Sequence, residues 1–235
     1  MTTQQDTRLA KILPWATLAG ELLASERPYE QSVHLRPSAT SVRLVDLRPD
    51  RPQLDCGEIT SFERAREQLH ERLSNRPTEI PGRPTPEKKL QSFLIAAAYR
   101  SERRLAALSQ QLSFVTDEQV FFRSDNKRVV CDLLAIRTHE LGDAPVVIEL
   151  KTKREMTRLI EQLDNAAQII DAHREAFAHM FGAILSREVK LVGPCERWLI
   201  WPASSSSVDP RRDELARQRI VVKGYKAQRE GFAIL

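Results

Sequence analysis

The sequence predicts an α/β protein in which a mixed β-sheet is flanked by helices, and three observations lead to this prediction. Residues 128–137 and 144–151 are two apolar segments joined by turn-forming residues, which is typical of a β-hairpin. Longer segments before and after them, at 85–108 and 156–181, repeat apolar side chains at helical spacing. Shorter strands are predicted at 115–123, at 189–192 and 197–201 (or one bent strand), and at 219–225 and 231–235, with a charged helix at 209–219.

A proline-rich segment divides the chain of 235 residues. Residues 75–86 contain Pro77, Pro81, Pro84 and Pro86, which favour a linker over a regular element. We therefore predict an additional N-terminal α+β region at 1–80 and a larger domain at 84–235. Within the N-terminal region we expect a helix at 8–23 that Pro14 breaks or restarts, a strand at 41–47 and a helix at 60–73. Its role stays open between packing, DNA recognition and dimerisation.

Composition limits the class of protein. Hydrophobic residues make up 41% and charged residues 29%, which is typical of a globular chain and excludes disorder. The net charge of +4 permits a nucleic-acid partner without requiring one. The three cysteines are odd in number and far apart, which argues against a disulfide framework or a zinc site. Neither a signal peptide nor a run of eighteen apolar residues is found, so we expect a cytoplasmic protein without a membrane partner.

The second strand of the predicted hairpin ends in charged residues. Glu149 and Lys151 are two residues apart, so on a strand they point to the same face, together with Val147. Val146, Ile148 and Leu150 then face the opposite way, into a core. Charge on so apolar a strand is costly unless it is paired or binds a metal, which is the first indication of a site.

Two further acids could join this pair. Asp132 lies in the first strand of the hairpin, and adjacent strands are about 4.8 Å apart, so a suitable register brings Asp132 and Glu149 to one cation. Glu87 lies in the first turn of the helix that Thr85 caps and Pro86 begins, on the same face as Leu90 and Leu94. The alternative for Glu87 is a carboxylate that complements the helix dipole.

These residues resemble the PD-(D/E)XK nuclease superfamily. The pattern is Asp132, a gap of sixteen residues, and then Glu149-Leu150-Lys151. Glu87 matches the acid that members often carry on the preceding helix, and Gln162 matches a glutamine on the following helix. The resemblance covers residues 84–203. It departs at Cys131, which replaces the proline, and at Ala166, where some branches have a tyrosine.

The resemblance implies a restriction-endonuclease-like fold and hydrolysis of phosphodiester bonds with Mg²⁺ or Mn²⁺. Asp132 and Glu149 would bind the metal, joined by the Leu150 carbonyl oxygen, and Glu87 would bind through water or help to hold a second ion. Lys151 would orient or activate the attacking water. Gln162 would point toward the end of the lysine strand, although a solvated glutamine is an equal alternative. Lys153, Arg154 and Arg158 could follow the phosphate backbone.

DNA is the expected substrate, RNA is the alternative, and a homodimer fits an enzyme that cuts both strands. A hypothesis from another class also remains open, namely a nuclease-like DNA-binding or scaffolding module that does not cut. The sequence contains no Gly-rich phosphate loop, no Gly-x-Ser-x-Gly and no His-Glu-x-x-His, so other common hydrolase and nucleotide-binding motifs are not found. The five histidines are scattered and receive no role.

Overall fold

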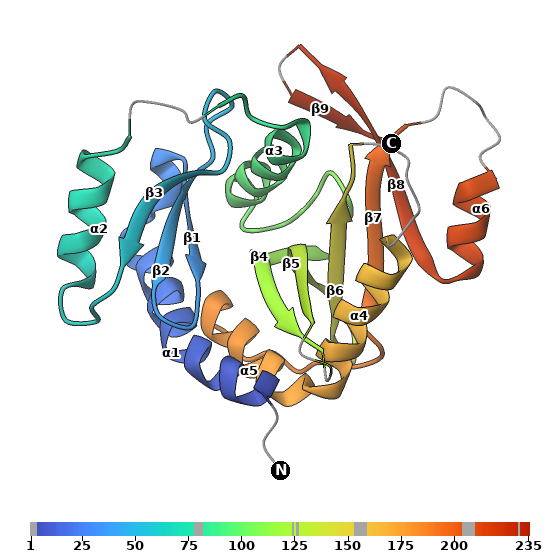
Figure 1. The fold of residues 1–235 in the computed structure, drawn as a ribbon, viewed down its shortest axis with the longest axis horizontal. Coiled ribbons are helices and arrows are strands. Elements are labelled where there is room, and N and C mark those ends of the chain that lie inside the picture. Colours follow the sequence, from blue (N-terminus) through green and yellow to red (C-terminus); the bar gives the residue numbers. More distant parts are fainter. Residues whose placement is uncertain are drawn as a thin grey trace.

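A six-stranded sheet with helices on both faces forms the centre of the protein, and a three-stranded sheet lies beside it (Figure 1). The computed structural model describes residues 4–77, 82–123, 125, 127–152, 159–203, 210–229 and 231–235. Three neighbouring strands of the large sheet run parallel, namely β6 (Gly142–Leu150), β7 (Glu196–Pro202) and β8 (Ile220–Gln228), and its remaining neighbours are antiparallel. The predicted class, a mixed α/β protein with helices flanking the sheet, is therefore confirmed.

The N-terminal region contains an antiparallel sheet of order β1-β2-β3 against which two helices pack. Its elements are α1 Gln4–Ser25, the 3₁₀ helix η1 Pro28–Gln31, β1 Val33–Pro37, β2 Val42–Asp46, β3 Leu54–Ile59 and α2 Ala65–Ser74.

The large sheet has the order β4-β5-β6-β7-β8-β9. Its strands are β4 Leu112–Phe122, β5 Arg128–His139, β6 Gly142–Leu150, β7 Glu196–Pro202, β8 Ile220–Gln228 and β9 Gly231–Ile234. The helices are α3 Pro86–Arg100, α4 Leu159–Ala172, α5 Arg174–Leu185 and α6 Pro210–Arg217.

Several predicted elements are wrong in extent. The helix predicted at 85–108 ends at Arg100, and Leu105 and Leu108 are buried from turns, so their apolar spacing reflects packing. The long helix predicted at 156–181 is two helices, because the backbone of His173 (φ −120°, ψ 33°) is not helical. Residues 189–192 form only an isolated bridge at Leu191. Pro14 lies inside α1 and does not break it.

The two faces of the large sheet carry separate apolar clusters. Val147 belongs to the cluster beneath α4 and α5, whereas Ile148 and Leu150 belong to the cluster beneath α3, as the alternation in the sequence predicts. Trp198 and Trp201 are buried, one in each cluster. A third cluster fills the space between β1–β3, α1 and α2. No helix in the described ranges is both long and apolar enough to cross a membrane.

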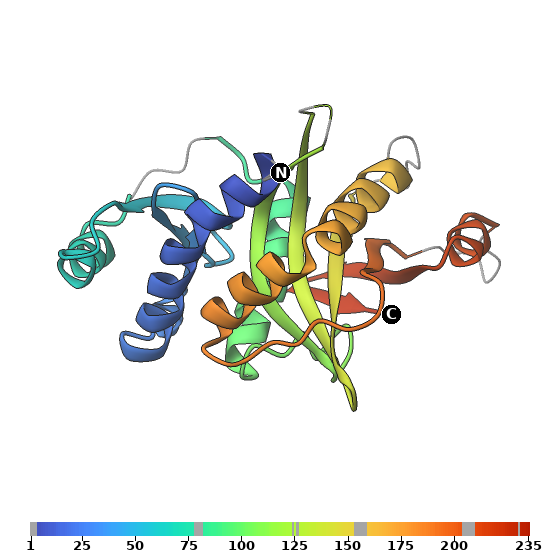
Figure 2. The same ribbon diagram turned by 90° about the horizontal axis from the view of Figure 1, so that it is seen from below.

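Helix α1 connects the N-terminal region to the large sheet. Leu9 and Ile12 belong to the same apolar cluster as Phe177 and Phe181 of α5, and Figure 2 shows α1 and α5 side by side. The helices cross closely at Gly20, where a Cβ atom would lie 2.2 Å from the Ala183 carbonyl oxygen. Only glycine fits this crossing, so the N-terminal region shares its core with the rest of the chain.

The first helix also covers the outer edge of β4. The side-chain oxygen of Gln5 accepts a hydrogen bond from the Phe122 amide (3.0 Å), and Arg8 donates from Nε to the Val120 carbonyl (2.9 Å). These side chains pair main-chain groups that a neighbouring strand would otherwise bind.

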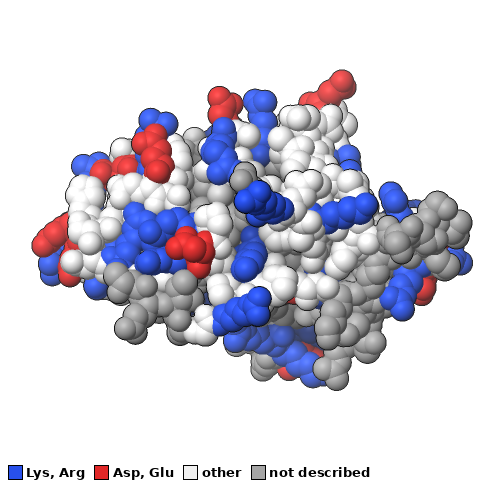
Figure 3. Space-filling model, turned by 90° about the horizontal axis from the view of Figure 1, so that it is seen from above, with Lys and Arg blue, Asp and Glu red and all other residues white. Residues whose placement is uncertain are grey.

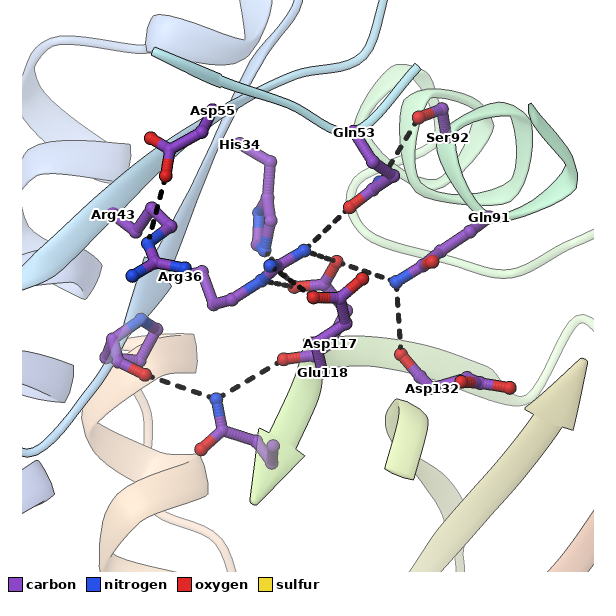
Figure 4. Close-up of polar contacts among 12 residues, drawn as sticks. His34, Arg36, Arg43, Gln53, Asp55, Gln91, Ser92, Asp117, Glu118 and Asp132 are labelled. Atoms are coloured by element: carbon purple, nitrogen blue, oxygen red, sulfur yellow. Dashed lines mark hydrogen bonds and ion pairs between the residues drawn. The ribbon is translucent and has the colours of Figure 1, made fainter. Parts of the chain in front are cut away.

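A buried carboxylate joins the two sheets (Figure 4). Asp117 of β4 is fully buried and accepts hydrogen bonds from Arg36 Nε (2.7 Å) and Nη2 (2.6 Å). His34 Nε2 lies 3.0 Å from the same carboxylate, and the Tyr99 hydroxyl lies 2.7 Å from His34 Nδ1. Because the carboxylate only accepts, His34 carries its proton on Nε2. Both partners come from β1, so the small sheet is fixed to the large one by charge as well as by packing.

Burial alone would raise the pKa of Asp117, but Arg36 and His34 outweigh it and hold that pKa well below its usual range. Burial lowers the pKa of His34 despite the nearby carboxylate, so the imidazole is neutral. Asp117 is therefore an ionised group that the folded protein stabilises.

We predict that Asp117→Asn lowers the free energy of unfolding at pH 7 by about 3–5 kcal/mol, because it breaks a buried ion pair. A lowered pKa contributes stability above the unfolded value of about 3.9, and that stability is lost as the pH falls below it. The difference between wild type and variant should therefore narrow below about pH 4. Denaturant unfolding between pH 3.5 and 7 measures it.

The control is Glu58→Gln, which removes one acidic partner of Arg43 from a partly exposed ion pair. It should cost about 0–1 kcal/mol. An Asp117→Asn protein no less stable than this control would contradict the role given to Asp117.

Candidate active site

The predicted hairpin is present, and its register places Asp132 across from Glu149. The β5–β6 ladder pairs Leu133 with Ile148 and stops there, one step before these two acids. Strand β6 continues alongside β7, where Leu150 pairs with Ile200. The amide of Leu150 instead donates to Asp132 Oδ2 (2.7 Å). The two strands thus separate into a fork with one carboxylate on each arm.

Two further predicted residues, Lys151 and Glu87, lie around this fork. Glu149 is buried and accepts a hydrogen bond from the ammonium group of Lys151, as their positions on one strand face predict. Glu87, half-buried in the first turn of α3, is close enough to act electrostatically on Asp132 and Glu149. Asp132, Glu149 and Lys151 therefore lie together, and the charge of Glu87 acts on all three.

Without a bound cation, the charged side chains at the fork are in an unfavourable electrostatic environment. Burial, followed by the charge of Glu149, raises the pKa of Asp132 well above its usual value. Burial also raises the pKa of Glu149, against the opposing effect of Lys151. Burial would lower the pKa of Lys151, but Glu149 outweighs it and the pKa is raised. Three acids and one lysine leave an excess of negative charge that a cation would neutralise.

The donor set fits a hard cation that keeps most of its waters. Mg²⁺ is usually held by one or two carboxylates together with water and phosphate oxygens. Asp132 and Glu149 supply two carboxylates, and the Leu150 main chain lies beside them. Within the described ranges, no three side chains of His, Cys, Asp or Glu form a complete ligand set. Glu87 is therefore placed near the fork without completing such a set.

The remaining predicted residues are not drawn into the fork. Gln162 lies in the first turn of α4, half-buried, and among the described side chains it has no hydrogen bond to Glu87, Asp132, Glu149 or Lys151. Its predicted role stays a prediction. Lys153, Arg154 and Arg158 lie outside the described residues.

The face above the fork carries basic side chains. Helix α3 and the β8–β9 hairpin lie at this end of the molecule in Figure 1, and Figure 3 shows Lys and Arg gathered across the middle of that face. Exposed basic residues of the first turn of α3 and of the hairpin include Lys88, Lys89, Lys226 and Arg229. The hairpin is held against α3 by Phe93 and Phe232, whose ring centroids are 5.5 Å apart.

Polar residues behind the fork were not predicted from the sequence. The side chain of Gln91 in α3 contacts both Asp117 and the main chain of Asp132, and Glu118 of β4 has a positive φ of 43°. A signal was present in both places. Thr116 to Gln119 is a polar run in the middle of an apolar strand, and Gln91 interrupts the buried face of its helix.

We predict that Asp132→Asn raises Tm in the presence of a chelator, because it removes a partly buried charge that Glu149 repels while keeping an acceptor for the Leu150 amide. A gain of about 1 kcal/mol would raise Tm by about 2–4 °C in a chain of this size. Thermal unfolding followed by circular dichroism measures the shift.

Asp143→Asn is the matched control at the other end of the same hairpin. Asp143 is buried, and unlike Asp132 it is paired with Arg187 (2.9 Å) and Thr138 (2.9 Å). Its replacement should lower Tm. A fall in Tm for both variants would show that Asp132 is an ordinary stabilising acid.

Comparison with known proteins adds no assignment. No protein-family model matches this chain, and no curated protein matches its sequence. The geometry and charge of the fork are therefore the observations that indicate a function.

Proposed function

We propose that this protein is a metal-dependent endonuclease that hydrolyses DNA phosphodiester bonds at the fork between β5 and β6. The observation that carries the proposal is the convergence of two carboxylates on neighbouring strands, the partly buried Asp132 and the buried Glu149, with Lys151 beside them. Buried like charges are costly without a counter-ion, so such a pair favours a binding site for a divalent cation.

Asp132 and Glu149 would hold Mg²⁺ or Mn²⁺, with the Leu150 carbonyl oxygen as a further ligand and Glu87 acting through water. When bound, the ion supplies charge neutralisation at the phosphate and lowers the pKa of a coordinated water. Lys151 orients this water through its ammonium group and stabilises negative charge on the transferring phosphate. Its contact with Glu149 keeps it at the fork in the free protein.

The arrangement of the fork also supports a restriction-endonuclease-like core as the finer fold class. An acid-bearing helix α3 precedes the hairpin, the charged strand end of β6 follows it, and helix α4 comes next in the chain. Basic side chains on the same face suit a phosphate backbone. The three free, buried cysteines suit a reducing compartment, and we propose the cytoplasm.

A second candidate is a nuclease-like module that binds DNA or scaffolds without cutting. One observation favours it: over the described parts of the chain, no three metal-ligating side chains form a set. The two candidates differ in whether Mg²⁺ or Mn²⁺ binds, which isothermal titration calorimetry of the metal alone resolves.

We predict metal-dependent cleavage of supercoiled plasmid or single-stranded DNA that is lost in chelator. Glu149→Gln and Lys151→Ala should each reduce the rate by at least about 100-fold, as expected when a group that stabilises the transition state is removed. Gel assays with Mg²⁺, with Mn²⁺ and with chelator measure the rates, and a single-stranded RNA substrate tests the alternative.

Glu140→Gln is the control for Glu149→Gln, because Glu140 is an exposed acid at the far tip of the same hairpin. It should cleave like wild type. Full activity in the Glu149 variant would refute the site, and the absence of both metal binding and cleavage of any substrate would favour the non-cutting module.

A further inference from the structure

Gln91 is a buried amide that connects α3 to two strands. Its Nε2 donates to Asp117 Oδ2 (3.0 Å) and to the main-chain oxygen of Asp132 (3.4 Å), as Figure 4 shows. Gln91 lies four residues after Glu87, so the two share a face of the helix. One side chain therefore links the helix that carries Glu87 to the residue that carries a carboxylate of the fork.

The other end of this link is held by the N-terminal sheet. The side chain of Arg36 in β1 is 11% exposed and donates hydrogen bonds to Asp117 from two nitrogens. Its Nη2 also donates to Gln53 Oε1 (2.6 Å), and the Gln53 amide donates to the Ser92 hydroxyl (3.1 Å). A side chain with several hydrogen-bond partners is held in one position by them. Asp117 is therefore a rigid hydrogen-bond partner for Gln91.

The backbone beside Asp132 is in an uncommon conformation. Asp117 pairs with Leu133 and Gln119 with Cys131, which places Glu118 across from Asp132. The positive φ of Glu118 (43°) is unfavourable for a residue with a Cβ atom. Arg36 Nη1 donates to the Glu118 carboxylate (2.7 Å) and restrains it there. Such conformations persist where the surrounding contacts over-determine them.

We propose that Gln91 is a positioning residue, through which the Arg36–Asp117 pair of the N-terminal sheet fixes Asp132 and helix α3 at the fork. This assigns the N-terminal region a role: it is the rigid support of the site. The consequence for activity rests on the proposed function, because it assumes that Asp132 binds the metal. Partners behind metal ligands typically change metal affinity or activity 10–100-fold when they are replaced.

The test compares Gln91→Met with Ser92→Ala. Methionine has a similar length but donates no hydrogen bond, so it removes both contacts of Gln91. Ser92 is equally buried on the same helix and contacts Gln53, but it has no hydrogen bond to Asp117 or Asp132. Both variants should lower Tm. Gln91→Met alone should lower Mn²⁺ affinity and kcat about 10–100-fold, with KM for DNA changed less than kcat.

Hydrogen exchange gives a readout that needs no activity. Amides of β5 around Asp132 should exchange faster in Gln91→Met than in Ser92→Ala at equal distance below each Tm. If the methionine protein does not fold, Gln91→Asn replaces it, because it keeps the amide but shortens its reach. Unchanged exchange in β5 in the folded Gln91 variant would overturn the proposal.

The results distinguish a wrong positioning role for Gln91 from a wrong nuclease function. If wild type binds Mn²⁺ and cleaves, and Gln91→Met does so equally well, the positioning role is wrong and the site stands. If wild type neither binds Mn²⁺ nor cleaves, the nuclease function is wrong, and the exchange of β5 amides still decides the role of Gln91.

Discussion

The ionised carboxylate of Asp117 is the contact on which the arrangement of this protein depends. A fully buried charge is tolerated only when several donors surround it, and here they come from two elements: Arg36 and His34 from β1, and Gln91 from α3. Each donor fixes the place of its own element. The small sheet, the first long helix of the larger domain and strand β4 are therefore held at one point, and the fork lies directly beyond it.

The fork has the opposite character. Asp117 is surrounded by hydrogen-bond donors that include the cation of Arg36, whereas Asp132 and Glu149 repel each other and the charge of Lys151 acts on both. The hydrogen-bonded network around Asp117 thus supports Asp132 and Glu149, whose negative charges are not balanced within the protein. Such a division is typical of functional sites, where binding chemistry is kept at some cost in stability by well-packed surroundings.

Much of this arrangement follows from the sequence. Alternation along β6 predicts which side chains enter the core, and the turn residues predict the hairpin that brings Asp132 toward Glu149. Neither pattern predicts the Asp117 network, because Arg36 and His34 are more than eighty residues away along the chain and pair by tertiary contact. The apolar pattern also does not predict β1, because this strand carries the polar side chains of His34 and Arg36. The split of the predicted long helix at His173 depends on packing that local spacing does not record.

The cover that α1 provides over β4 has a consequence for association between copies of the chain. An open sheet edge invites strands of another molecule to extend it and leads to aggregation. Gln5 and Arg8 occupy main-chain groups on the β4 edge, and the opposite edge is β9, only four residues long. Growth of a continuous intermolecular sheet through β4 would first require α1 to detach. Association of two copies by strand pairing at the β4 edge is therefore disfavoured.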